Sequence, residues 1–227
     1  MAHLETFTVR IVDGPSSLFT FLSGFDCVLA ASCPSEDSAL PEVRAALANF
    51  VAQSVVASYG VDLGRDACAN LLVAAIETAI AGSSELIPLK MIALFREKTY
   101  WHAFALGRFE LHVVEPGLPV ATSTLQYTLR NHAQSMGKSV PHGDDRIGDA
   151  LLCPRPGELT ATNFAYQRLE LKRNQSFVVH PKQMPGVASN RIATASPSRV
   201  EELESWLLRF VPDMRPAELF YIAVQST

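Results

Sequence analysis

The stretch from residue 90 to residue 114 constrains the fold most, because it contains three β-strand patterns with almost no chain between them. Apolar and β-branched residues predict strands at Lys90–Phe95, Thr99–Leu106 and Phe109–Val114. Short polar segments, Glu97-Lys98 and Gly107-Arg108, are predicted to form the connecting turns. Strands joined so closely pair as antiparallel neighbours. The sequence therefore predicts an antiparallel meander near the middle of the chain.

The same strand pattern recurs on both sides of this meander. The further predicted strands are Thr6–Val12, Leu18–Leu22, Asp26–Ala31, Val120–Ser123, Gln167–Leu171, Ser176–His180 and Leu219–Val224. We expect a hairpin-like pair around Ser23-Gly24 and a second hairpin around Lys172–Gln175.

Three segments with apolar residues three and four positions apart predict amphipathic helices. They begin near Asp37, near Asp66 and at Ser198, where Glu201 completes a capping box. A shorter helix is expected near Leu125–Met136, within a less regular excursion over about residues 125–165. The apolar face of each long helix requires cover by a sheet or another helix.

Antiparallel strands and one-sided helices together favour the α+β class. A four-layer α-β-β-α sandwich, in which two antiparallel sheets are flanked by helices, would cover every one of these apolar faces. We expect a single domain over residues 1–227, and other α+β architectures remain open.

The composition excludes several classes of function. A formal net charge of -4 gives no electrostatic reason to expect nucleic acid or an anionic membrane as a partner. No apolar run approaches the roughly 20 residues that span a bilayer. The four cysteines are isolated from one another and form no CxxC pair, which favours reduced thiols in the cytoplasm.

The order of elements resembles the PP2C-type (PPM) metal-dependent protein phosphatase domain over nearly the whole chain. Phe25–Ala31 is similar to the strand of that family that ends in Asp-Gly. Lys90–Val114 resembles the paired strands around the family's Gly-Asp-Ser-Arg turn, and Leu125–His132 is similar to the Leu-Thr-x-Asp-His stretch that follows them. Arg168–Val179 resembles the hairpin that leads to Ser-Asp-Gly. The resemblance implies a PP2C-like fold.

The acidic residues that catalysis in this family requires are missing. Its carboxylates hold two divalent metal ions that bridge a water nucleophile. The corresponding positions here read Pro15-Ser16-Ser17, Ser32-Cys33, Gly107-Arg108-Phe109, His180-Pro181-Lys182 and Pro216-Ala217-Glu218. The resemblance therefore implies a degenerate member with no catalytic residues, metal or cofactor. Its former active-site cleft would be lined by Ser17, Ser32, Cys33, Arg108, His180 and Lys182.

A divergent hydrolase is the alternative. A metal ion or an acid/base pair could use the polar cluster His142, Asp144, Asp145 and Asp149. The same residues equally fit a solvated loop that Arg146 neutralises. A nucleophilic Cys33 or Cys153 paired with a histidine is a further possibility for an enzyme.

Two other segments each allow a structural and a binding interpretation. Tyr100, His102 and Phe104 share one face of a predicted strand, which suits core packing or an aromatic binding surface. The basic residues around Arg168 and Lys172 suit a solvated turn or phosphate recognition.

We therefore expect a non-catalytic binding, regulatory or structural subunit of a protein complex. Its expected partners are proteins, including a phosphorylated or acidic segment, and neither nucleic acid nor membrane. The oligomeric state is left open by the sequence.

Overall fold

The computed structural model describes residues 7–12, 17–22, 27–32, 64–81, 90–97, 100–115, 118, 121–139, 155, 157–170, 172, 175–181 and 221–226. The chain divides into two compact units. Unit 1 comprises residues 1–17, 109–124 and 170–227, and unit 2 comprises residues 18–108 and 125–169.

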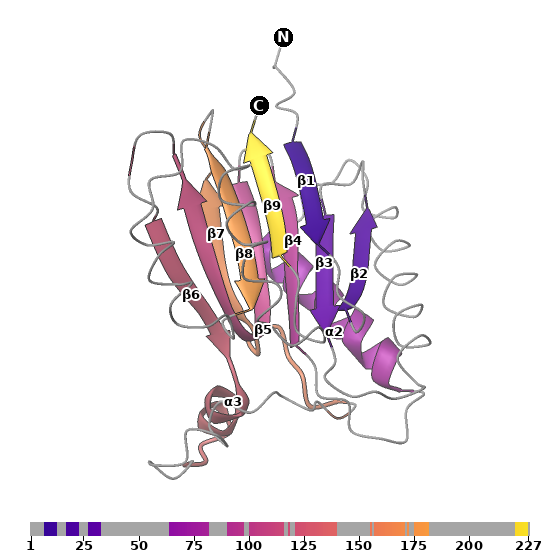
Figure 1. Ribbon diagram of the computed structural model, residues 1–227. Coiled ribbons are helices and arrows are strands. Elements are labelled where there is room, and N and C mark those ends of the chain that lie inside the picture. The colour runs from indigo at the N-terminus through magenta and orange to yellow at the C-terminus, as the bar shows by residue number, and fades with distance from the viewer. Residues whose placement is uncertain are drawn as a thin grey trace. The chain divides into compact units, whose positions relative to one another are not determined.

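Unit 1 is built on an antiparallel sheet (Figure 1). The strand order is β1 (Phe7–Val12), β9 (Tyr221–Ser226), β8 (Ser176–Pro181) and the second part of β5 (Tyr100–Val114). All three pairings are antiparallel, with Val9 opposite Val224 and Leu111 opposite Val179. The strand patterns at the two ends of the chain are therefore confirmed, and they meet as neighbours although more than 200 residues separate them.

Unit 2 contains β2 (Ser17–Leu22), β3 (Cys27–Ser32), β4 (Lys90–Glu97) and the first part of β5. Adjacent strands pair in that order, and both β3–β4 and β4–β5 are antiparallel. Two further strands, β6 (Ala121–Tyr127) and β7 (Ala165–Glu170), also pair with β5. The predicted antiparallel pairing of the central strands is confirmed.

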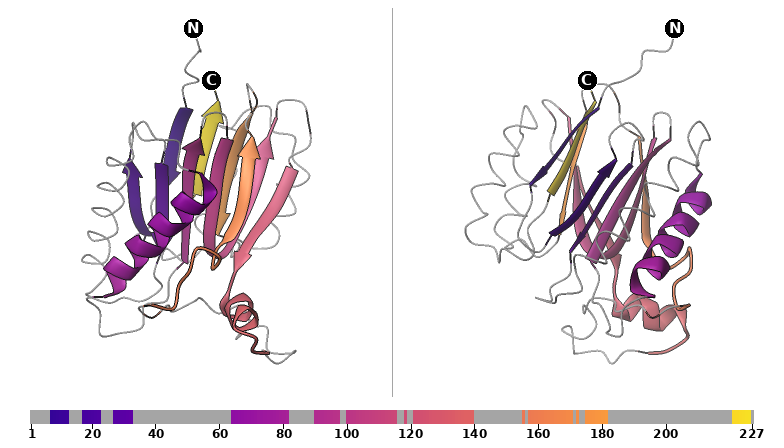
Figure 2. Two further views of the ribbon diagram at one scale, coloured as in Figure 1. Left: turned by 180° about the vertical axis from the view of Figure 1, so that it is seen from behind. Right: turned by 90° about the vertical axis from the view of Figure 1, so that its right-hand side faces the viewer.

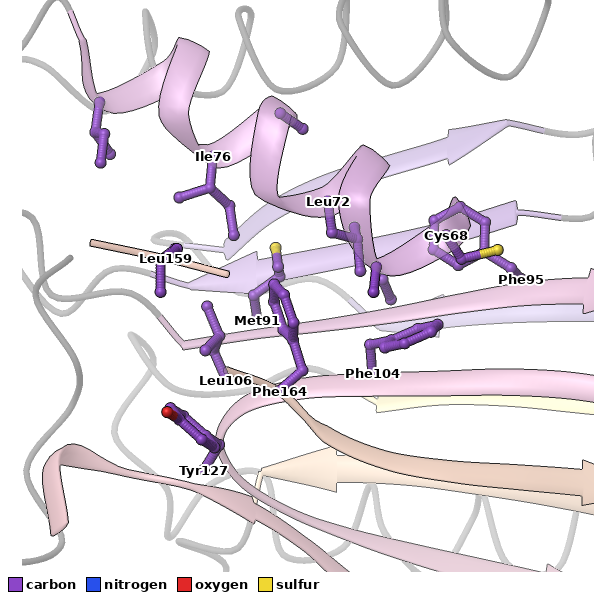
Figure 3. Packing of buried hydrophobic residues seen from close by; sticks show 14 residues of the cluster. Cys68, Leu72, Ile76, Met91, Phe95, Phe104, Leu106, Tyr127, Leu159 and Phe164 are labelled. Atoms are coloured by element: carbon purple, nitrogen blue, oxygen red, sulfur yellow. The ribbon is translucent and has the colours of Figure 1, made fainter. Parts of the chain in front are cut away.

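Helix α2 (Arg65–Ile80) lies across one face of the unit 2 strands (Figure 2). Its side chains at positions 68, 72 and 76 are completely buried, as the helical spacing of apolar residues predicts. They pack against alternate residues of β4 and β5, which include Met91, Phe95, Phe104 and Leu106 (Figure 3). Together these residues form an apolar core within unit 2.

The predicted turn at Gly107-Arg108 is wrong, because β5 runs without interruption from Tyr100 to Val114. Its residues up to Leu106 pair with β4, whereas those from Phe109 onward pair with β8. Gly107 has a φ of 92°. A backbone conformation that only glycine adopts easily allows the strand to continue at the point where it changes partners.

The predicted hairpin between the strands on either side of Lys172 is also wrong. Strand β7 pairs with β5, and β8 pairs with β5 and β9. A side-chain contact accompanies the pairing of β8 with β5: Gln175 Nε2 donates to Glu115 Oε2 at 2.6 Å, directly after β5 ends. Turn residues predict that a chain reverses, but they do not specify which strand it then joins.

The helix expected near Leu125–Met136 begins later than predicted. Strand β6 extends to Tyr127, and α3 (Leu129–Ser135) follows. Thr128 and Asn131 form a reciprocal cap, in which Thr128 N donates to Asn131 Oδ1 at 2.9 Å. The predicted helices near residues 37–59 and from residue 198 lie outside the described residues. Among the helices that are described, none has the length and apolar character needed to cross a membrane.

Candidate functional site

One end of three adjacent strands in unit 2 carries the positions at which the resemblance expects metal-binding acids. Ser32 is the last residue of β3, and it lies opposite Lys90, the first residue of β4. Met91 lies opposite Leu106 of β5, so Gly107 and Arg108 follow at the same end. Of the residues at this strand end, Ser32, Lys90 and Arg108 are polar and Gly107 has no side chain. Lys90 and Arg108 are basic.

Lys90 is the residue of this site that the sequence interpretation missed. It is only 3% exposed, although lysine is rarely buried. The sequence signal for this residue was a lysine at the start of an otherwise apolar strand. A lysine in that position is usually interpreted as the solvent-exposed end of the strand. Arg108 is half-buried.

The described side chains of this strand end are not of the kind that bind a divalent cation. Hard metal ions such as Mg²⁺ and Mn²⁺ require several oxygen ligands, mostly carboxylates. Among the described side chains, no group of three or more His, Cys, Asp or Glu residues could hold a metal ion. Lys90 and Arg108, the basic residues at this strand end, carry no acceptor atom in their side chains and so supply no ligand for such an ion.

The remaining predicted site residues are placed only in part. Ser17 is the first residue of β2, and His180 lies in β8 directly opposite Glu110. Cys33 and Lys182 lie outside the described residues, as does the alternative cluster of His142, Asp144, Asp145 and Asp149. Their assignment to a cleft or to a metal site stays a prediction.

A second polar cluster lies at the other end of β4 and β5. His102, which is 4% exposed, is held between Glu97 and Tyr166. Its Nε2 lies 2.6 Å from Glu97 Oε2, and its Nδ1 lies 2.9 Å from the Tyr166 hydroxyl. The two ring nitrogens of His102 therefore bridge a carboxylate and a phenolic hydroxyl. Of the two interpretations of this strand, core packing holds for Phe104 and Trp101, each 1% exposed.

Two arginines stack on tyrosine rings beside this cluster. The Arg65 Cζ atom lies 4.4 Å from the ring centroid of Tyr166, and the Arg168 Cζ atom lies 3.5 Å from that of Tyr100. Burial raises the pKa of the Tyr166 hydroxyl, while the charges of Arg65 and Arg168 act in the opposite direction. Tyr166 is therefore a neutral hydroxyl at physiological pH and not an activated nucleophile.

Unit 1 contains a buried carboxylate and a buried imidazole on the same strand. Glu110 and His112 of β5 are 6% and 0% exposed, and Glu110 Oε2 lies 3.9 Å from His112 Nε2. Nδ1 of His112 lies 2.9 Å from the Thr122 hydroxyl of β6. Because the two residues are two positions apart on a strand, they share one face of the sheet.

A third cluster of buried polar side chains lies at the edge of the apolar core that α2 covers. Asn163 Nδ2 donates to the Tyr127 hydroxyl at 2.5 Å, and Asn163 Oδ1 accepts from Thr160 N at 2.6 Å. His132 Nδ1 lies 3.4 Å from the same hydroxyl. These polar groups satisfy one another at the edge of the apolar cluster, which identifies them as structural.

The comparisons with known proteins identify the fold. No family model and no curated protein matches the chain. Solved structures match over almost its whole length. The serine/threonine phosphatase PstP/Ppp of Mycobacterium tuberculosis is 10% identical, with 97% of each chain covered and a TM-score of 0.60. PppA, a regulatory component of the type VI secretion system (T6SS) in Pseudomonas aeruginosa, is also 10% identical, with 98% of this chain and 97% of that chain covered and a TM-score of 0.61.

A third match carries metal ions. The catalytic domain of PstP in complex with 2 manganese ions is 12% identical, with 97% of each chain covered and a TM-score of 0.57. At these identities the likeness concerns the fold alone. The chain therefore has the fold of the PPM Ser/Thr phosphatases.

Proposed function

We propose that this protein is a non-catalytic relative of the PPM phosphatases that binds a phosphorylated or acidic segment of a partner protein. The observation that carries the proposal is the pairing of Ser32 with the buried Lys90 at the strand end where the resemblance expects metal-binding acids. In the family, two metal ions are bound at this position. In this protein, the side chain of Lys90 would supply the positive charge instead.

The electrostatics of that strand end support binding without hydrolysis. One solved structure of the same fold is described as a complex with 2 manganese ions. A metal pair needs nearby carboxylates, and a fixed ammonium close to it would raise its free energy by Coulomb repulsion. Without the metals there is no activated water nucleophile. Lys90 and Arg108 can still form charge-assisted hydrogen bonds to phosphate oxygens.

Ser17, Cys33, His180 and Lys182, the other residues that the resemblance assigns to the former cleft, remain predicted ligand contacts. The ligand would be part of another protein, so the chain would act as a regulatory or structural subunit of a complex. This role fits a chain that has the fold of the PPM phosphatases while the residues that the resemblance expects for metal chemistry are replaced.

The proposal includes the full α-β-β-α sandwich as one domain. In unit 2, Met91 and Phe104 face α2, whereas Ile92 and Ala103 alternate to the opposite face and are also completely buried. In unit 1, Leu111 and His112 occupy opposite faces of the sheet and are both completely buried. A sheet buried on both faces needs a layer on each side, as a four-layer sandwich provides.

Metal dependence is the first test of this function. We expect Mn²⁺ and Mg²⁺ to leave the melting temperature unchanged and the protein not to hydrolyse a generic aryl phosphate. A metal ion that binds only the native state must raise the melting temperature. A metal-dependent rise together with turnover would overturn the non-catalytic proposal and favour the divergent hydrolase.

Ligand binding is the second part of the test. A phosphopeptide library should yield ligands whose affinity falls about tenfold or more in Lys90→Met, because a charge-assisted hydrogen bond contributes roughly 1.5–3 kcal/mol. Arg108→Gln provides a second variant, since Lys90 is buried and its replacement can affect folding. Lys138→Met, at an exposed lysine, is the matched control. Equal affinities in all three variants and the native protein would argue against a ligand at this strand end.

A further inference from the structure

Two exposed arginines of unit 2 rest on tyrosine rings at the end of the sheet opposite to Lys90. Arg65 is the first residue of α2, and it covers Tyr166 of β7. Arg168, two positions further along β7, covers Tyr100 at the start of β5. Residues two positions apart on a strand lie on the same face. The two arginine–tyrosine stacks therefore belong to one surface.

Stacking leaves each guanidinium able to bind an oxyanion. The face of the guanidinium lies on the ring, so its N–H edge stays available for bidentate hydrogen bonds, and its ordering costs little on binding. In the part of the chain that the structure describes, neither arginine forms an ion pair with a carboxylate. Glu97, which lies close enough to influence the Tyr166 hydroxyl, is already bound to His102 at 2.6 Å.

The tyrosine platform is fixed by its neighbours. The Tyr166 hydroxyl lies 2.9 Å from His102 Nδ1, and its ring centroid lies 5.2 Å from that of the buried Phe104. These contacts hold the ring in one orientation, and Arg65 is positioned through the ring. A preorganised cation binds an anion with a smaller loss of side-chain entropy than a free arginine.

We propose that Arg65 and Arg168 form a binding surface for the phosphate group of a phosphorylated peptide. Exposed acids also border this surface, namely Asp66 beside Arg65 and Glu170 at the end of β7. They lower the local positive potential for every anion, so selection of the ligand depends on direct hydrogen bonds to the guanidinium edges. A phosphate dianion, with its higher charge and three acceptor oxygens, gains more from two guanidiniums.

This inference goes beyond the proposed function because it requires neither the former active-site cleft nor the loss of metal binding. It assigns a separate surface at the opposite end of β4 and β5. The two sites can be distinguished, since Lys90 belongs only to the first and Arg65 and Arg168 belong only to the second.

The test uses a phosphoserine peptide, its unphosphorylated form, its glutamate form and inorganic phosphate. The full chain is labelled with 3-fluorotyrosine, and the Tyr166 resonance is assigned with Tyr166→Phe among the five tyrosines. We expect the phosphopeptide to shift this resonance in the native protein and equally in Lys90→Met. Calorimetry should show binding of the phosphopeptide that is at least about tenfold tighter than that of the glutamate form. Equal binding of the glutamate peptide, or of inorganic phosphate, would overturn the assignment to a phosphorylated peptide.

Variants then separate the arginines from the platform. The double variant Arg65→Gln/Arg168→Gln should weaken phosphopeptide binding about tenfold or more, whereas Arg155→Gln, at another exposed arginine, should have no effect. Tyr166→Phe keeps the ring but loses the hydroxyl contact with His102, so its binding should fall between that of the native protein and that of Tyr166→Leu. Tyr166→Leu removes the platform and should bind as weakly as Arg65→Gln. Unchanged binding in the double variant would overturn the proposal, as would loss of the Tyr166 shift in Lys90→Met.

Discussion

Cys68 is the described residue whose chemistry is altered most by its position. It lies on the buried face of α2 and is completely shielded from solvent. Burial, with a smaller contribution from the charge of Glu97, raises the pKa of the thiol from 9.0 to about 12. Only the thiolate is an effective nucleophile, so this cysteine is chemically inert in the native protein.

Alkylation can test this directly. At pH 8 we expect iodoacetamide to leave Cys68 unmodified in the native protein and to modify it after unfolding, as read by site-resolved mass spectrometry. Asn70→Cys is the matched control, because position 70 is exposed on the same helix and its thiol should react readily. Similar native rates at positions 68 and 70 would show that the thiol is accessible.

The same shift predicts a dependence of stability on pH. The folded state holds the thiol proton up to a pKa of about 12, whereas the unfolded chain releases it from about pH 9. The stabilisation is thus complete below pH 9 and is lost as the pH rises from 9 towards 12. Relative to Cys68→Ala, the native protein should lose about 1.4 kcal/mol more between pH 8 and pH 10 in urea unfolding.

For single residues, the sequence predicted burial best where apolar residues recur at the spacing of a helix. Cys68, Leu72 and Ile76 were expected on one helix face and are found there. Lys90 and the contact between His102 and Tyr166 could not be predicted. The burial of a lysine and a hydrogen bond across 64 residues both depend on how strands pair, which local sequence does not record.

At the scale of elements, β5 is the part of the fold that the sequence described least well. Gly107-Arg108 has the composition of a tight turn, and two short strands on either side are a reasonable prediction from such a dipeptide. The strand instead continues, because β4 supplies partners up to Leu106 and β8 supplies partners from Phe109 onward. Long-range pairing overrides local turn propensity here.

Replacement of Gly107 tests this description of β5. Its φ of 92° is unfavourable for any residue with a Cβ atom, and the position is buried. We expect Gly107→Ala to lower the free energy of unfolding by about 1–3 kcal/mol from backbone strain, with a further loss if the added methyl group crowds its neighbours. Gly137→Ala is the control, because its φ is 72° but nothing lies within 4 Å of the added Cβ atom. A smaller loss at position 107 than at position 137 would contradict a buried, strained strand.

The whole molecule raises the question of whether units 1 and 2 fold as a single domain. They share β5, whose first part pairs in unit 2 and whose second part pairs in unit 1. If the chain is the single domain of the proposed sandwich, loss of strand pairing in one unit should also destabilise the other.

The decisive experiment destabilises unit 2 by a mutation and measures the effect on the stability of unit 1. Leu72 is completely buried on the inner face of α2, so Leu72→Ala should cost about 2–5 kcal/mol through lost burial and the cavity that remains. Native-state hydrogen exchange, read by mass spectrometry of peptides, reports the opening free energy of each strand separately. If the chain is one cooperative domain, protection should fall by the same amount in β4 of unit 2 and in β9 of unit 1. Asn70→Ala, at an exposed position of the same helix, should change neither. A loss confined to β3 and β4 would instead show that the two units unfold independently in spite of their common strand.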